Sequence, residues 1–229
     1  MKRLALFDLD HTLIPADSDH EWGRFMVREG MVDRARFEQE NNHFYEDYKA
    51  GCLDIEAYLR VALAPLARYS RAELDAFHAR FMSEVIAPKI LPPARALVDE
   101  HLKRGDLCCV VTATNAFVTA PIAHAFGIEN LIAVDVATED DRPEGRFTGA
   151  FKGVPSFQAG KIVRTESWLA SLGLSWQDFE QSFFYSDSRN DIPLLEKVTD
   201  PVATNPDDTL RAHAERLGWP IIELFSATT

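Results

Sequence analysis

The segment Leu6-Phe7-Asp8-Leu9-Asp10-His11-Thr12-Leu13 constrains this chain most, because a short apolar run ends in two carboxylates separated by a single residue. A short apolar run predicts a buried strand, and open α/β sheets bind ligands just beyond the carboxyl ends of their strands. Side chains alternate along a strand, so Asp8 and Asp10 are expected to point to the same side. The pattern therefore predicts a paired acidic site at one edge of a sheet.

Three later segments supply polar side chains of the same kind. Residues 107–112 read as a second buried strand that ends in the hydroxyl of Thr112. Lys161 begins an amphipathic run over 162–172, and residues 183–191 form another apolar strand that ends in acids. Taken in order, DxDxT, a strand-terminal Thr, a Lys and DSxxD resemble the haloacid dehalogenase superfamily of phosphohydrolases. The resemblance spans nearly the whole chain.

The spacing of these motifs refines the match. About 100 residues separate Thr12 from Thr112, far more than the roughly two to six residues of an ordinary βα loop. Amphipathic patterns within this interval predict helices over 21–29, 33–49, 55–66 and 71–86. The interval resembles the helical cap of subfamily IB, the phosphoserine phosphatase-like and histidinol-phosphate phosphatase-like branch. We therefore expect a catalytic core formed by 1–15 and 91–229, and a cap formed by 16–90.

The remaining elements favour an α/β fold with a doubly wound parallel sheet, the Rossmann-like core of this superfamily, and an inserted α-helical cap. Strands and helices alternate along most of the chain after residue 90. The expected elements are a helix at 115–126, strands at 128–136, 145–151 and 200–203, a helix at 207–217 and a closing strand at 219–224.

Phosphate chemistry calls for a divalent cation, because a carboxylate that approaches a dianionic ester is repelled. Mg²⁺ prefers oxygen ligands and suits one or two carboxylates together with a phosphate oxygen. Asp8 and Asp187 are the expected side-chain ligands. The resemblance adds the backbone carbonyl of Asp10, and Asp191 is expected to support either the metal waters or Lys161; it could also cap the helix that follows.

The catalytic roles follow from the same residues. Asp8 would attack phosphorus to form an aspartyl-phosphate, while Asp10 gives a proton to the leaving alcohol and then activates water. Thr112, with backbone N–H groups nearby at Ala113, would hold the phosphoryl oxygens together with Asn190. Lys161 would neutralise charge that develops on those oxygens.

The predicted cap carries the expected substrate contacts, Asp17 and Arg60, at the positions where that branch carries a Glu and an Arg. Together they would bind the ammonium and carboxylate of phosphoserine. The chain departs from the family, however, in having Thr112-Ala113-Thr114-Asn115 where a Ser-Gly-Gly-Phe run is usual. An acidic cluster at 17–21 suits an amine-bearing ester without a carboxylate, so histidinol phosphate is preferred to phosphoserine.

Bulk composition narrows the partners and the compartment. The net charge is −12 with no basic run, which argues against nucleic acid or an anionic membrane and favours a small phosphorylated metabolite. No apolar run approaches the roughly 20 residues of a membrane span. Of the three cysteines, Cys108 and Cys109 are adjacent in a predicted strand and should face opposite sides. These features lead us to expect a cytoplasmic protein, and they carry no signal of oligomeric state. The family resemblance implies a role in amino-acid biosynthesis.

Two other functions share this chemistry. A phosphotransferase would form the same aspartyl-phosphate and pass the group to an acceptor alcohol. A phosphoacceptor signalling domain also combines acids, Mg²⁺, a hydroxyl and a Lys around an Asp, but it lacks the DxDxT pattern and has no room for a long helical insertion.

Overall fold

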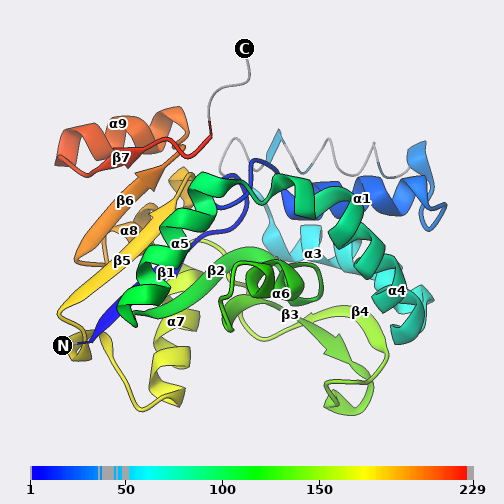
Figure 1. Cartoon of the computed structure of the whole chain (residues 1–229). Helices are drawn as coiled ribbons and strands as arrows, with labels where there is room; N and C mark the ends of the chain where they lie inside the picture. Colours follow the sequence, from blue (N-terminus) through cyan, green and yellow to red (C-terminus); the bar gives the residue numbers. More distant parts are fainter. Residues whose placement is uncertain (1, 36, 38–43, 45, 48–51, 226–229) are drawn as a thin grey trace.

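A single sheet organises the molecule in the computed structural model, which describes residues 2–35, 37, 44, 46–47 and 52–225. Within those residues the sheet has seven strands in the order β4-β3-β2-β1-β5-β6-β7 (Figure 1). The strands are β1 (Arg3–Phe7), β2 (Leu107–Asn115), β3 (Asn130–Thr138), β4 (Phe147–Lys152), β5 (Gln181–Ser186), β6 (Asp200–Thr204) and β7 (Ile221–Ile222). The α/β doubly wound fold expected from the sequence is confirmed.

One edge of the sheet departs from the all-parallel expectation. β4 pairs antiparallel with β3, whereas the other neighbouring strands pair in parallel. The connection from β3 to β4 is the short loop 139–146, closed by a hydrogen bond from the Glu139 N–H to the Arg146 carbonyl, 2.8 Å. A loop this short joins antiparallel strands, because a parallel pair needs a crossover of a dozen or more residues.

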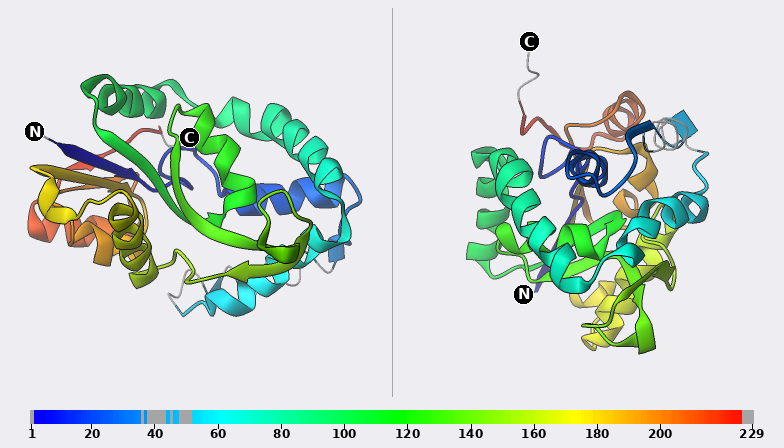
Figure 2. Two further views of the ribbon diagram at one scale, coloured as in Figure 1. Left: turned by 90° about the horizontal axis from the view of Figure 1, so that it is seen from below. Right: turned by 90° about the vertical axis from the view of Figure 1, so that its right-hand side faces the viewer.

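Helices cover both faces of the sheet. One face packs against α5 (Pro92–Arg104) and α6 (Ala116–Ala125), and the other against α7 (Ala159–Ser171), α8 (Ile192–Leu195) and α9 (Asp208–Leu217) (Figure 2). The adjacent Cys108 and Cys109 belong to the apolar clusters on opposite faces, as strand alternation predicts. Two buried cores therefore hold the central strands in place.

A helical segment lies beyond the carboxyl ends of β1 and β2, formed by α1 (Ser18–Arg28), α3 (Ile55–Leu63) and α4 (Arg71–Phe81) (Figure 1). The helices predicted over 21–29, 55–66 and 71–86 are present with shifted ends, and the last continues as the π-helix Met82–Ile86. Most of the helix predicted over 33–49 falls outside the described residues. No helix in the described parts of the chain combines the length and apolar character needed to cross a membrane.

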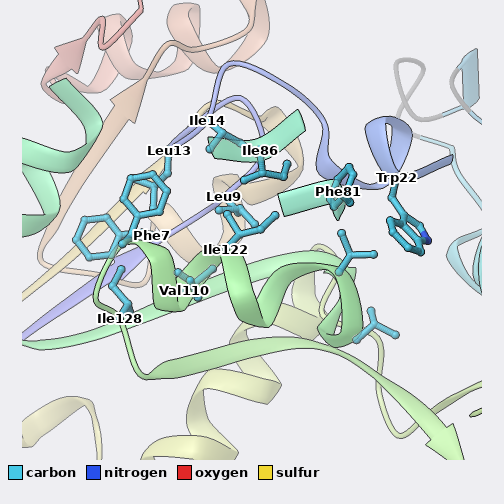
Figure 3. Close-up of a cluster of buried hydrophobic side chains, with 14 of the residues drawn as sticks. Phe7, Leu9, Leu13, Ile14, Trp22, Phe81, Ile86, Val110, Ile122 and Ile128 are labelled. Carbon is cyan, nitrogen blue, oxygen red and sulfur yellow. The ribbon is translucent and has the colours of Figure 1, made fainter. Parts of the chain in front are cut away.

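The larger core joins the helical segment to the sheet. Phe7 and Val110 of the sheet, Leu13 of the first loop, and Trp22 and Phe81 of the helical segment all belong to this one apolar cluster (Figure 3). Each large apolar side chain buried in this way contributes about 1.5–3 kcal/mol. The helical segment is thereby held against the strand ends, where the acidic loop emerges.

Candidate active site

The first acidic loop begins where β1 ends. The Asp8 N–H donates to the Tyr185 carbonyl at 2.9 Å, after which the chain leaves the strand and turns through His11 at φ 56°. Strand alternation therefore does not orient Asp10, contrary to the sequence expectation. Its carboxylate accepts hydrogen bonds from the Ser18 N–H at 2.7 Å and the Thr114 hydroxyl at 2.8 Å. These two contacts fix Asp10 beside Asp8, while the exposed His11 lies outside the cluster.

Lys161 joins two of the predicted carboxylates. Its Nζ lies 2.8 Å from Asp8 Oδ1 and 2.6 Å from Asp191 Oδ2, and the residue is only 3% exposed. Burial disfavours the ammonium, but Asp191 and Asp8 outweigh it and raise the pKa of Lys161. Lys161 is therefore a fixed positive charge at the carboxylate that follows β1.

Asp191 contacts Lys161, which is one of the roles expected for it, but it does not cap the helix that follows. It precedes α8, yet its carboxylate makes no capping bond to that helix. Its Oδ2 accepts instead from Lys161 and from the Ser186 hydroxyl, the latter at 2.7 Å. Burial raises the pKa of Asp191 to about 6 despite Lys161, and the charge of Asp8 adds to the effect.

Thr12 connects Asp8 to Asp187. Its hydroxyl oxygen lies 3.0 Å from Asp8 Oδ2 and 3.2 Å from Asp187 Oδ1, and it accepts from the Asp187 N–H at 3.0 Å. A hydroxyl has one proton to donate, so it serves one carboxylate at a time. Burial, with repulsion from Asp8 and Asp191, raises the pKa of Asp187 well above its usual range. Lys161 alone therefore does not offset the burial of these carboxyl groups and their mutual repulsion.

This donor set fits a hard divalent cation. Asp8 and Asp187 present carboxylate oxygens around a shared hydroxyl, and their mutual repulsion would be relieved by a cation between them. Among the described residues, no three His, Cys, Asp or Glu side chains are arranged to hold a metal. The ligand set implied by the family resemblance needs only two side chains, because its third protein ligand is the backbone carbonyl of Asp10. Mg²⁺ completes such a set with waters and phosphate oxygens.

The protonation of Asp10 suits proton transfer. Burial, followed by the charges of Asp17 and Asp8, raises the pKa of Asp10 to about 8. A carboxyl group with a pKa near the working pH can both give and take a proton.

The predicted phosphate-binding residues lie around the same strand ends. Phe7 pairs with Val110, so Thr112 and Ala113 follow at the edge where Asp8 emerges. Thr112 is buried, and its hydroxyl oxygen accepts from the Thr114 N–H at 3.1 Å, which leaves its proton available. Asn190, also buried, accepts at Oδ1 from the Gln158 amide at 3.2 Å.

The two expected substrate contacts of the helical segment differ in their placement. Asp17 caps α1 by accepting from the His20 N–H at 2.9 Å, and it lies close enough to Asp10 to raise the pKa of that residue. Arg60 lies on the outer face of α3, where it is 64% exposed and bonds to Glu56 at 2.9 Å. The expectation that Arg60 faces the substrate is not met in this arrangement.

Several polar residues at the site were absent from the sequence-based set of site residues. Thr12 belongs to the DxDxT motif, but the motif pattern alone assigns it no contact. Thr114 and Asn115 occupy the run that departs from the family, and they bond to Asp10 and to Asp19, the latter at 3.2 Å. Tyr58 of α3 also donates to Asp19. The departure from Ser-Gly-Gly-Phe was the available signal, since it replaces two glycines and an aromatic residue with groups that include hydrogen-bond donors.

Comparisons with known proteins identify the family of this chain. The family model for haloacid dehalogenase-like hydrolases matches residues 5–196. The chain is 49% identical to a histidinol-phosphatase of Neisseria meningitidis serogroup C, over 97% of this chain and 99% of that protein. It is 33% identical to a phosphoserine phosphatase of Mycobacterium tuberculosis, over 95% of this chain and 69% of that protein.

Solved structures extend the comparison to the fold. A Bordetella pertussis protein of unknown function superposes with a TM-score of 0.92 at 50% identity, covering 98% of this chain and 100% of that one. A phosphoserine phosphatase captured as an analogue of its phospho-aspartyl intermediate superposes with a TM-score of 0.66 at 21% identity, covering 98% and 94%. With the family model matched across most of its length, this chain belongs to the haloacid dehalogenase-like hydrolase family.

Proposed function

We propose that this chain, a phosphatase of the haloacid dehalogenase type, is a Mg²⁺-dependent phosphomonoester hydrolase that uses Asp8 as its nucleophile and prefers histidinol phosphate. The observation that carries the chemistry is the buried contact of Lys161 with both Asp8 and Asp191. The observation that favours the substrate is the 49% identity to a histidinol-phosphatase over nearly the full length of both chains.

In the first step, one oxygen of Asp8 attacks phosphorus and the alcohol departs. Lys161 bonds to Asp8 Oδ1 and Thr12 reaches Oδ2, so the carboxylate is held in one orientation before attack. Lys161 then neutralises part of the charge on the phosphoryl oxygens, and Thr112 and Asn190 donate to them. Such preorganisation lowers the barrier because no donors need to move into place.

Asp10 handles the protons of both steps. With a raised pKa of about 8, it carries a proton to give to the leaving alkoxide. It then takes a proton from the water that attacks the aspartyl-phosphate, which releases phosphate and restores Asp8. Ser18 and Thr114 hold its two oxygens in place during this exchange.

Asp8, Asp187 and the backbone carbonyl of Asp10 would hold Mg²⁺, and Asp191 would support the site through Lys161. When bound, the cation offsets the repulsion between the ester and the carboxylates. Burial and the charges of Asp8 and Asp191 raise the pKa of Asp187, and relief of this repulsion by a cation supports the assignment.

A small amine-bearing ester suits the surroundings of the site. Residues 16–90 would act as the cap that encloses the substrate, and enclosure excludes nucleic acids and proteins as substrates. Asp17 lies near Asp10 and would meet the ammonium group. The outward position of Arg60 leaves the carboxylate of phosphoserine without the partner expected from the sequence, so phosphoserine ranks second.

A panel of small phosphomonoesters tests the proposal. We expect the highest kcat/KM for histidinol phosphate, followed by phosphoserine, with phosphate released in proportion to alcohol. A higher kcat/KM for phosphoserine would overturn the substrate assignment. Transfer of phosphate to added alcohols in preference to water would show a phosphotransferase instead.

A further inference from the structure

A cavity lies within the helical segment. It has a volume of about 170 Å³ and lies between α1 and α3, with Asp19, Trp22, Phe37, Phe44 and Tyr58 among its lining residues. This volume is several times the roughly 30 Å³ that one water molecule occupies in the liquid. The lining is mainly apolar and aromatic, which suits a flat ring.

Asp19 is a half-buried carboxylate on the lining of this cavity. Its Oδ1 accepts from the Asn115 amide at 3.2 Å and its Oδ2 from the Tyr58 hydroxyl. Neither donor is charged, and no cationic group in the described part of the chain forms an ion pair with Asp19. Each carboxylate oxygen can accept a further hydrogen bond. Asp19 therefore presents a fixed, oriented acceptor to the cavity.

Trp22 supplies an unused donor on the same lining. Its side chain is 2% exposed, and its indole nitrogen has no hydrogen-bond partner among the described residues. Figure 3 shows Trp22 at the edge of the apolar cluster, with its ring nitrogen on the side away from Phe81. A buried donor without a partner is destabilising, and a ligand that accepts from the indole N–H would remove this cost.

The cavity is linked to the reacting groups through Asp17. The charge of Asp17 raises the pKa values of both Asp10 and Asp19, so it lies near both. Thr114 and Asn115 are adjacent in β2 and bond to Asp10 and Asp19 respectively. A phosphate ester bound at Asp8 would therefore pass Asp10 and reach the cavity at Asp19.

We propose that this cavity binds the imidazole ring of the leaving alcohol, with Asp19 accepting from the ring N–H and Trp22 donating to the other ring nitrogen. The inference rests on the proposed function and adds the residues that select the substrate. A neutral imidazole has one donor and one acceptor, which matches this carboxylate and this indole. A substrate carboxylate in this cavity would be repelled by Asp19. Arg68, the cationic residue of the lining, is exposed and is not placed to offset that repulsion.

The test compares substrates that differ only in the ring. Wild type, Asp19→Asn and Trp22→Phe are assayed for kcat/KM with histidinol phosphate and with phenylalaninol phosphate, whose ring has no nitrogen. We expect Asp19→Asn to lower kcat/KM for histidinol phosphate about ten- to a hundredfold and Trp22→Phe about three- to tenfold. Neither should change kcat/KM for phenylalaninol phosphate by more than about twofold, because that ring makes neither bond.

Controls separate packing from recognition. Glu56→Gln removes a carboxylate from the exposed face of α3 and should leave both substrates unaffected. Tyr58→Phe keeps the aromatic ring and removes the hydroxyl that orients Asp19. It should therefore lower kcat/KM for histidinol phosphate and leave kcat/KM for phenylalaninol phosphate unchanged. The Ki of histidinol as a product inhibitor should rise in Asp19→Asn by the same factor as kcat/KM falls, which gives a readout independent of the chemical step.

The outcomes distinguish this inference from the proposed function. If wild type hydrolyses histidinol phosphate best but Asp19→Asn and Trp22→Phe lower kcat/KM equally for both rings, the subsite is wrong and the substrate assignment stands. If wild type hydrolyses other small esters but not histidinol phosphate, the substrate assignment is wrong and the subsite falls with it.

Discussion

Replacing Lys161 by methionine is expected to lower the free energy of unfolding by about 3–5 kcal/mol near neutral pH. Methionine keeps most of the length of lysine and removes its charge. Lys161 is 3% exposed, with Asp8 at 2.8 Å and Asp191 at 2.6 Å. The substitution therefore leaves two buried carboxylates without their shared cation, and breaking a buried ion pair in this way is strongly destabilising.

The deficit should depend on pH in a defined direction. Asp191 has a folded-state pKa of about 6, above its unfolded value, so the folded state binds more protons and loses stability as the pH rises from about 4 to about 6. Without Lys161 the folded-state pKa rises further. The variant should therefore be weakest above about pH 7 and should recover part of the deficit towards about pH 5, where the carboxylates are protonated.

Urea unfolding of both proteins in a chelator, at about pH 8 and about pH 5, measures these quantities. Lys197→Met is the matched control, because Lys197 is 42% exposed and pairs with Glu166 at 3.4 Å. An exposed pair of this kind contributes only about 0–1 kcal/mol. A deficit for Lys161→Met below about 1 kcal/mol, or one equal at both pH values, would refute the reasoning.

Three further predictions address the proton carrier, the metal and a buried histidine. Asp10→Asn should slow turnover of alkyl phosphates about 10²–10⁴-fold. For aryl phosphates, stopped-flow measurement of the first step should show a much smaller defect. A defect that does not depend on the pKa of the leaving group would exclude Asp10 as the general acid. Chelation should abolish phosphate release, with Mg²⁺ restoring it fully and Ca²⁺ poorly; full activity in chelator would exclude the metal assignment. Burial lowers the pKa of His78, so wild type should lose stability as the pH falls below about 6.5 and His78→Leu should lose less; parallel profiles in urea titrations would show that His78 does not titrate this way.

Local patterns predicted the elements that carry the acidic groups. The apolar run before Asp8 and the one before Asp187 became the neighbouring strands β1 and β5, because a buried parallel strand has to be apolar on both faces. Lys161 and Asp191 are 30 residues apart in the sequence, and only the order of the motifs indicated that they belong to one site.

Side-chain direction was less predictable. Arg60 lies in a helix that the sequence predicted, yet Tyr58 bonds to Asp19 while Arg60 is exposed. Two positions along a helix turn a side chain through about 200°, so a small error in helical phase exchanges an inward residue for an outward one. The side-chain directions of Asp10 and Thr114 are equally hard to predict from the sequence. A turn after β1 decides where Asp10 points, and an irregular register between β2 and β3 decides where Thr114 points.

Trapping the phosphoryl group on the protein tests the central claim most directly. Wild type is mixed with excess histidinol phosphate, quenched in acid within one turnover and reduced with borohydride, which converts an aspartyl-phosphate into homoserine. Peptide mass spectrometry should find homoserine at position 8 in wild type and none in Asp8→Asn. Release of phosphate and histidinol by wild type without homoserine at position 8, or with the modification at another aspartate, would contradict nucleophilic catalysis by Asp8.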